Sequence, residues 1–204
     1  MKKIMFFIAA MLITSVVFAQ TIRDEHIAFD KDNNYFAVVL DVSGYDEEVV
    51  EDALASRFEQ VTKKSSKSGK FRVYKGQPFR EFGPLNYDIY TQIVRVGKKK
   101  DNRVAVQLLV SKGNMNFVTP STDSDVIDGM RSFLKGFVDY LQEYDTSLKA
   151  VAQDKVISKL EKDAKSLVSD KEKLQKQLAD KENEIIKKQE EIQKAKELLQ
   201  TLRP

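Results

Sequence analysis

The sequence predicts an α+β fold: an antiparallel sheet of about four to five strands with two helices on one face, followed by a long C-terminal coiled-coil helix. Three observations support this fold class. The segment 35–145 alternates strand-like and helix-like runs and holds most of the aromatic residues. Those runs follow the order strand, helix, strands, helix, which suits helices packed on one face of a sheet. The segment 151–203 contains no Gly, Pro or aromatic residue, as expected of a long solvated helix.

These patterns divide the chain into five segments. They are a signal peptide (1–19), an N-terminal segment (20–34), the α+β domain (35–145), a helical connection (146–156) and the coiled coil (157–203). The two folded parts differ in composition, because nearly all aromatic residues after the signal peptide precede the connection. We therefore treat them as separate folding units.

The first 19 residues contain the parts of an export signal in the required order. Lys2 and Lys3 precede an apolar run, and Ala19 is a small residue at the site that signal peptidase reads. The run is shorter than the roughly 20 residues that a membrane-spanning helix needs. We expect cleavage after Ala19 rather than a membrane anchor, and hence an exported protein, periplasmic or secreted, with no transmembrane segment after cleavage. Without cysteine, the usual bacterial lipid anchor is excluded.

The composition excludes several kinds of chemistry. The chain has no Cys and a single histidine, His26, so disulfides, thiolate nucleophiles and multi-histidine metal sites are excluded. Removal of Lys2 and Lys3 lowers the formal net charge from +3 to +1, which does not favour binding to a phosphate backbone. We expect no catalytic, cofactor-binding or metal-binding residues, no cofactor and no nucleic-acid partner, and therefore not an enzyme.

The α+β domain begins with a strand, a helix and a second strand. Residues 35–42 alternate apolar side chains on one face, as a strand does. Asp46 is placed to cap a helix that runs to about Thr62, in which apolar residues recur at 3.6-residue spacing. Residues 69–75 form the next strand, and the Gly and Pro residues of 76–84 indicate turns.

A hairpin is the clearest tertiary signal in the domain. Residues 88–96 and 103–111 flank the polar loop 97–102, and the second run alternates apolar and polar residues. This alternation is typical of an antiparallel sheet with one buried face. Ser121 or Thr122 is expected to cap the second helix, which is the most apolar helix of the domain. Aromatic residues near the turns, Phe79, Tyr87 and Tyr90, are expected in the core rather than around a pocket.

The C-terminal segment carries a heptad repeat. Eleven of its fourteen core positions are apolar, and steps of three and four residues keep them on one seam. Lys171, Lys181 and Lys188 hold the other three positions and should loosen the middle of the seam, because their ammonium groups must reach water. The apolar seam residues are Ile157, Leu160, Ala164, Leu167, Leu174, Leu178, Ile185, Ile192, Ala195, Leu199 and Leu202.

The charges beside the seam permit a parallel dimer without specifying one. Glu191 would face Lys196 of the neighbouring helix, and the other pairs of this register carry no like charges. A trimer, an antiparallel pair, a different partner chain or a solitary helix held by ion pairs stays open. Apolar residues of 146–156 leave the heptad register, but the absence of Gly and Pro there favours a nearly continuous helix.

With these elements assigned, residues 35–141 resemble an uncharacterised family of small exported bacterial proteins whose domain is similar in topology to one repeat of the TATA-binding protein. The resemblance rests on the element order behind a signal peptide, and the C-terminal coiled coil lies outside it. It implies a fold and no activity. DNA binding is not implied, because topology does not fix function.

Three functions are compatible with these observations. We favour a non-enzymatic interaction or scaffold protein of the bacterial cell envelope that binds copies of itself or an envelope protein through the coiled coil. One alternative is a periplasmic holdase chaperone. The other is a small-ligand-binding protein with a cavity between sheet and helices. The basic loops 63–70 and 98–100 could bind an anionic lipid or glycan, although such runs are more often simply solvated loops.

Overall fold

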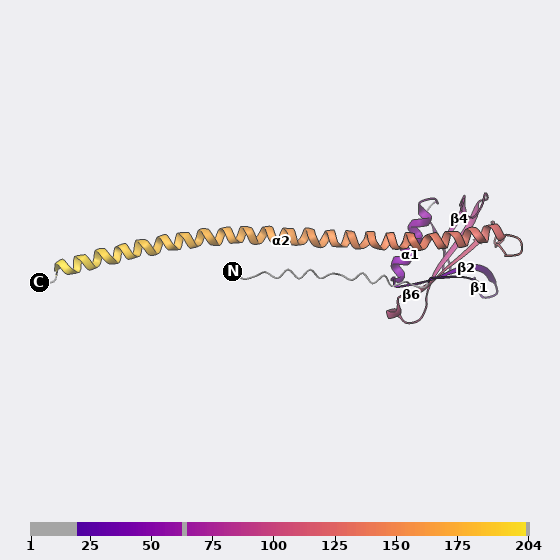
Figure 1. Cartoon of the computed structure of the whole chain (residues 1–204), viewed down its shortest axis with the longest axis horizontal. Helices are drawn as coiled ribbons and strands as arrows, with labels where there is room; N and C mark the ends of the chain where they lie inside the picture. Colours follow the sequence, from indigo (N-terminus) through magenta and orange to yellow (C-terminus); the bar gives the residue numbers. More distant parts are fainter. Residues whose placement is uncertain (1–19, 63–64, 203–204) are drawn as a thin grey trace. The chain divides into compact units, whose positions relative to one another are not determined.

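The structure is a computed structural model that describes residues 20–62 and 65–202 (Figure 1). The predicted signal peptide, residues 1–19, lies outside the described residues. The chain divides into two compact units, with the boundary between Thr146 and Ser147. The boundary is close to the one expected from composition.

A six-stranded antiparallel sheet forms the first unit, with strand order β1-β2-β6-β5-β4-β3. The α+β class and the antiparallel sheet are confirmed, but the strand count is higher than the predicted four to five. The hairpin expected on the sequence is β5 and β6, which pair from Asp88↔Ser111 to Arg95↔Val104. The strands are β1 (Thr21–Ala28), β2 (Asn34–Ser43), β3 (Ser66–Ser68), β4 (Phe71–Gln77), β5 (Tyr87–Arg95) and β6 (Arg103–Ser111).

Two strands were not predicted, β1 and β3. β1 lies in residues 20–34, which the sequence pattern placed outside the domain, yet it pairs with β2 from Thr21↔Asp41 to Ala28↔Asn34. It is an edge strand, and edge strands are commonly charged because one side faces solvent. Because its side chains are largely charged, β1 lacks the alternation of apolar and polar residues from which strands are predicted. β3 has three polar residues and no apolar residue at all.

Two α-helices complete the structure. α1 spans Glu47–Glu59, and Asp46 holds the predicted cap position, although its side chain makes no capping hydrogen bond. A short 3₁₀ turn, η1 (Lys99–Asp101), lies in the β5–β6 loop. α2 spans Ser124–Leu202, 79 residues. The predicted second helix, the connection and the heptad segment are therefore one continuous helix.

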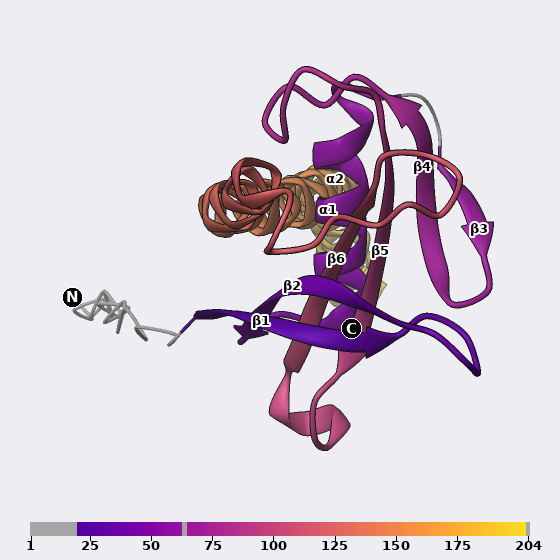
Figure 2. The ribbon, with the colours of Figure 1, turned by 90° about the vertical axis from the view of Figure 1, so that its right-hand side faces the viewer.

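Both helices contribute to a core on one face of the sheet, as predicted. The ring of Phe58 on α1 stacks on Tyr74 of β4 at 4.8 Å between centroids and meets Phe133 of α2 at 4.7 Å. The hydroxyls of Ser56 on α1 and Tyr140 on α2 lie 2.9 Å apart. Figure 2 shows α1 and the first turns of α2 on the same side of the sheet. This layer buries the apolar faces of both helices.

The opposite face of the sheet is also covered, whereas the strand pattern predicted a single buried face. Five aromatic residues gather there: Phe29, Tyr35, Phe71, Tyr90 and Phe117. Phe29 stacks on Phe71 with centroids 4.9 Å apart, and Tyr35 stacks on Phe117 at 4.0 Å. The cluster is assembled from segments far apart in the sequence. Periodicity within any one strand could not indicate it.

α2 passes so close to the loop between β4 and β5 that only glycine fits at the contact. A Cβ atom at Gly129 would lie 2.2 Å from the carbonyl oxygen of Glu81 and 3.0 Å from the Cα atom of Phe82. Further along α2, a Cβ atom at Gly136 would have no neighbouring heavy atom within 4 Å. The two glycines therefore differ in packing while sharing one helix.

We expect Gly129→Ala to lower the free energy of unfolding by about 2 kcal/mol or more, because the loop backbone must shift to admit the methyl group. The matched control Gly136→Ala should raise it by about 0.5–1 kcal/mol, since alanine is the better helix former. Urea unfolding followed by tyrosine fluorescence measures both, because all seven tyrosines lie in the first unit. Equal effects of the two substitutions would contradict the close contact.

Candidate functional site

The predicted seam lies on α2 in the second unit and is exposed to solvent. Its eight large apolar side chains range from 44% exposed at Ile157 to 70% exposed at Leu167. Ala164 and Ala195 are exposed as well, and Leu202 ends the helix with its side chain outside the described residues. Nothing within 20–62 and 65–202 covers the seam. The structure thus presents it as an unpartnered apolar stripe.

Local forces hold this part of α2 in helical form. Its sequence consists largely of Lys, Glu, Gln, Leu and Ala, which are good helix formers. Lys173 pairs with Asp170 at 3.4 Å, one turn earlier. Such exposed pairs contribute only about 0.2–0.5 kcal/mol each. The helix is therefore supported along its length, but weakly at each point.

Two of the three seam lysines have their charges compensated within the chain. The Nζ atom of Lys181 lies 2.7 Å from a carboxylate oxygen of Glu184, and that of Lys188 lies 2.6 Å from Glu191. Both glutamates occupy positions that flank the seam in the heptad. The ammonium groups therefore point toward the flank, and the aliphatic stems remain available to a neighbour.

The apolar stripe is wider than the predicted seam. Val156, Val168 and Leu198 flank the core positions and are 50%, 56% and 61% exposed, respectively. Apolar residues at flanking positions are the signal that could have revealed this width, because bundle helices carry a broader stripe than two-stranded coils. The apolar surface is broadest toward the two ends of the seam.

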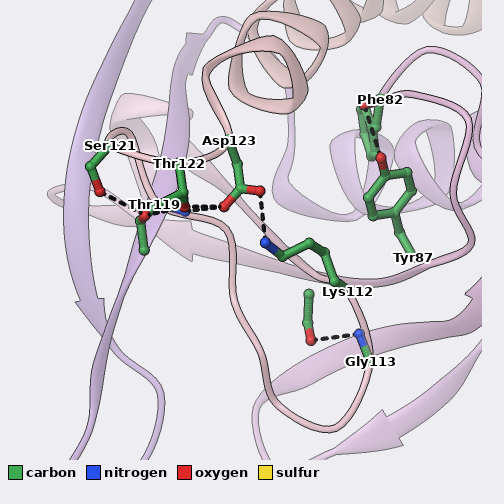
Figure 3. Close-up of polar contacts among 9 residues, drawn as sticks. Phe82, Tyr87, Lys112, Gly113, Thr119, Ser121, Thr122 and Asp123 are labelled. Atoms are coloured by element: carbon green, nitrogen blue, oxygen red, sulfur yellow. Dashed lines mark hydrogen bonds and ion pairs between the residues drawn. The ribbon is translucent and has the colours of Figure 1, made fainter.

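A polar cluster that includes Thr119, Asp123 and Lys112 lies at the start of α2 (Figure 3). The carbonyl oxygen of Asp123 accepts a hydrogen bond from the N–H of Ile127 at 3.1 Å. Asp123 therefore holds the cap position instead of the predicted Ser121 or Thr122. The hydroxyls of these two residues both lie within hydrogen-bond distance of the Thr119 hydroxyl, at 3.1 and 2.9 Å.

The carboxylate of Asp123 is nearly buried and accepts three hydrogen bonds. Its side chain is 9% exposed, and it accepts hydrogen bonds from Nζ of Lys112 at 2.8 Å and from Oγ1 of Thr122 at 2.7 Å. Burial by itself raises the pKa of Asp123, but the hydrogen bonds from Lys112, Thr122 and the Thr119 N–H lower it below the ordinary value. An acid held ionised in this way joins the helix start to Lys112, the residue that follows β6, and is not a proton donor at neutral pH.

The buried tyrosines belong to the core. Burial raises the pKa of Tyr74 to about 12, and it also raises the pKa of Tyr87 and Tyr90. The hydroxyl of Tyr87 donates a hydrogen bond to the carbonyl oxygen of Phe82 at 3.3 Å (Figure 3). Phe79, Tyr87 and Tyr90 are at most 4% exposed, which confirms their predicted core placement.

Two further polar features lie on the surface. His26 is exposed on β1. Glu51, from the acidic start of α1, pairs with Arg72 of β4 at 2.7 Å. In the described part of the chain, no group of three or more acidic or histidine side chains is arranged to hold a metal ion. No helix described there is long and apolar enough to cross a membrane.

Comparison of the chain with protein families, curated proteins and solved structures found no match. The resemblance to an exported family with a TATA-binding-protein-like domain therefore stays a prediction. Function has to be inferred from the surface of the molecule itself. Among the described residues, most of the large apolar side chains that are exposed lie on α2, and eight of them belong to the seam.

Asp123→Asn should lower the free energy of unfolding by about 1–3 kcal/mol at pH 7, because Lys112 loses the charge that accepts its hydrogen bond. The folded-state pKa of Asp123 lies below its unfolded value. Its contribution is therefore present above about pH 4 and is lost as the pH falls through the folded-state pKa. Unfolding energies of wild type and variant should converge between about pH 5 and pH 2.

The control for this prediction is Asp128→Asn on the same helix. Asp128 is 70% exposed and pairs with Arg131 at 2.6 Å, so its replacement should change stability by no more than about 0.5 kcal/mol. Urea titrations at a series of pH values measure all three proteins. A gap between wild type and Asp123→Asn that does not narrow in acid would contradict the assignment.

Proposed function

We propose that the chain is a non-enzymatic, exported interaction or scaffold protein of the bacterial cell envelope, and that copies of it associate through the seam on α2. The observation that carries the proposal is the apolar seam that begins at Ile157, whose heptad spacing continues without a break and whose eight large apolar side chains are exposed. Export is supported by the signal-like residues 1–19. The absence of catalytic motifs in the sequence favours a role in assembly.

Burial of the seam offers a large driving force. A Leu or Ile side chain contributes about 1.5–3 kcal/mol when it is fully removed from water. The eight large seam residues retain about half of their exposure or more. Covering them would thus contribute on the order of 10 kcal/mol per helix before the entropy of association is subtracted. That sum is enough for stable oligomers.

A second copy of the chain suits the seam better than an unrelated helix. In a parallel pair each core layer meets the same layer of the neighbour, so the apolar layers match without any further design. Glu191 would also lie near Lys196 of the neighbour. Lys181 and Lys188 already have carboxylate partners in their own chain, which lowers the repulsion between like layers. A trimer, an antiparallel pair and a different partner chain are outcomes that the experiments below distinguish.

The small-ligand alternative gains no support from the first unit. The layer between the sheet and the helices is filled by buried side chains, among them Phe58, Tyr74 and Phe133. A carrier would need a cavity in that layer. The proposal therefore assigns the function to α2 and gives the first unit the role of a presented surface.

Ile185→Lys should weaken self-association about 100-fold, because a charge enters the seam of every copy. The neighbouring residue provides the control: Ile186 is 52% exposed and Ile185 57%, but Ile186 lies off the seam. Ile186→Lys should change the dissociation constant less than about threefold. Sedimentation equilibrium on the chain from Gln20 measures both. A wild-type chain that is monomeric at about 100 µM, or equal effects of the two variants, would overturn self-association.

Filling the seam should have the opposite effect. Lys188→Leu replaces a core lysine by an apolar residue and should tighten association about tenfold or more, whereas Lys187→Leu, one position away and off the seam, should not. The measurement is the concentration dependence of helix melting by circular dichroism. A solitary helix would melt independently of concentration and respond alike to both substitutions.

A further inference from the structure

β4 covers only part of β5, so the remainder of β5 is an open strand edge. The register of the two strands reaches Arg72↔Thr91, whereas β5 continues to Arg95. β3 precedes β4 in the chain and lies on the far side of it, and the turn at Gly69, whose φ is +58°, joins the two strands. Among the residues that the structure describes, none pairs with β5 beyond Thr91 on this side.

The hydrogen-bond pattern shows which backbone groups face the open side. The N–H of Val96 donates to the carbonyl oxygen of Arg103 on β6 at 2.8 Å. In an antiparallel ladder, successive residues direct their N–H and C=O groups to alternate sides. Even-numbered residues of β5 therefore face β6, and Ile93 and Arg95 direct their N–H and C=O groups toward the open side. An added strand would find two donors and two acceptors there.

A positively charged groove accompanies this edge. It has a volume of about 190 Å³ and is lined by Ile93 and by the basic residues Lys67, Lys70 and Arg72. Glu51 compensates Arg72 at 2.7 Å. The ammonium group of Lys70 lies 5.3 Å from the centre of the Phe71 ring, and within 20–62 and 65–202 neither Lys67 nor Lys70 pairs with a carboxylate. The groove thus has two positive charges without an anionic partner.

We propose that this edge binds an extended acidic peptide segment of a partner protein, which adds a short strand to β5. The peptide backbone pairs with Ile93 and Arg95, and its carboxylates meet Lys67 and Lys70. Strand addition of this kind obtains affinity from main-chain hydrogen bonds and selectivity from side chains. The inference does not depend on the proposed function of α2.

The outer edge of β1 is a less suitable site for the same peptide. Its side chains Arg23, Asp24 and Glu25 carry both signs of charge, so they would attract and repel an acidic strand at once. Mixed charges are a common protection of edge strands against pairing. At the open part of β5, the carboxylates of Glu47 and Glu51 are paired with Arg95 and Arg72, so the charge left without a partner there, on Lys67 and Lys70, is of one sign. Free backbone groups beside uncompensated positive charge favour an acidic partner.

The test uses a fluorescein-labelled peptide of four Glu-Thr repeats as the probe. It is titrated with the chain from Gln20 to Pro204 and followed by fluorescence anisotropy at low salt. We expect a dissociation constant on the order of 10–100 µM, weakened at least about tenfold by the double variant Lys67→Glu, Lys70→Glu. The matched control Lys31→Glu, Lys135→Glu reverses two exposed charges elsewhere in the first unit and should shift the constant less than about twofold.

A second probe separates strand addition from simple charge attraction. It has the same side chains, but esters replace alternate backbone amides, so that N–H donors are lost while the charges stay. The ester probe should bind at least about tenfold more weakly, and the amide probe should slow hydrogen exchange at Ile93 and Arg95. Equal affinity of the two probes, insensitivity to the Lys67 and Lys70 reversals, or no binding at about 1 mM would overturn the proposal.

Discussion

Burial of the first turns of α2 against the sheet is the interaction on which the rest of the structure depends. Phe133 from α2 joins α1 to β4 through Phe58 and Tyr74, so the sheet-helix layer closes only when this helix is in place. The chain contains no cysteine, so its stability rests on noncovalent interactions, of which burial of this layer is the largest. The sheet, however, can bury only a limited length of helix. On the stripe that faces it, Leu141 is the last fully buried residue, Tyr144 is partly buried, and Leu148 on the same helix is 42% exposed.

Because of that limit, the second unit has no packed apolar face within the described chain. Isolated helices in water are marginal even for favourable sequences, and most helical stability in proteins comes from packing of an apolar face. The described contacts of this part of α2 are exposed ion pairs one turn apart, such as Lys173 with Asp170, and each contributes little. Packing of another helix against the seam would supply the stabilisation that these ion pairs do not give. Association of copies and full stability of the helix would then be coupled, so that each favours the other.

The sequence predicted those features that are local or periodic. α1, β2, the β5–β6 hairpin and the continuity of α2 follow from alternation, 3.6-residue spacing and the absence of Gly and Pro. Charged β1 and polar β3 lack the apolar alternation that marks a strand. The aromatic cluster on the second sheet face is a set of long-range contacts that no local pattern indicates. Likewise, the cap at Asp123 depends on Lys112 of a different segment, and the open edge of β5 depends on where β4 turns away.

Self-association through α2 would bring several sheets to a high effective concentration, and open strand edges that are concentrated in this way tend to pair with one another. The charges along the open edge of β5 oppose that outcome. Lys67 and Lys70 would meet the same lysines of any copy that tried to pair edge to edge, and like charges brought together there are unfavourable. An acidic strand meets no such repulsion. The same two lysines would therefore select a foreign acidic segment and reject a second copy, which would leave the seam as the route by which copies assemble.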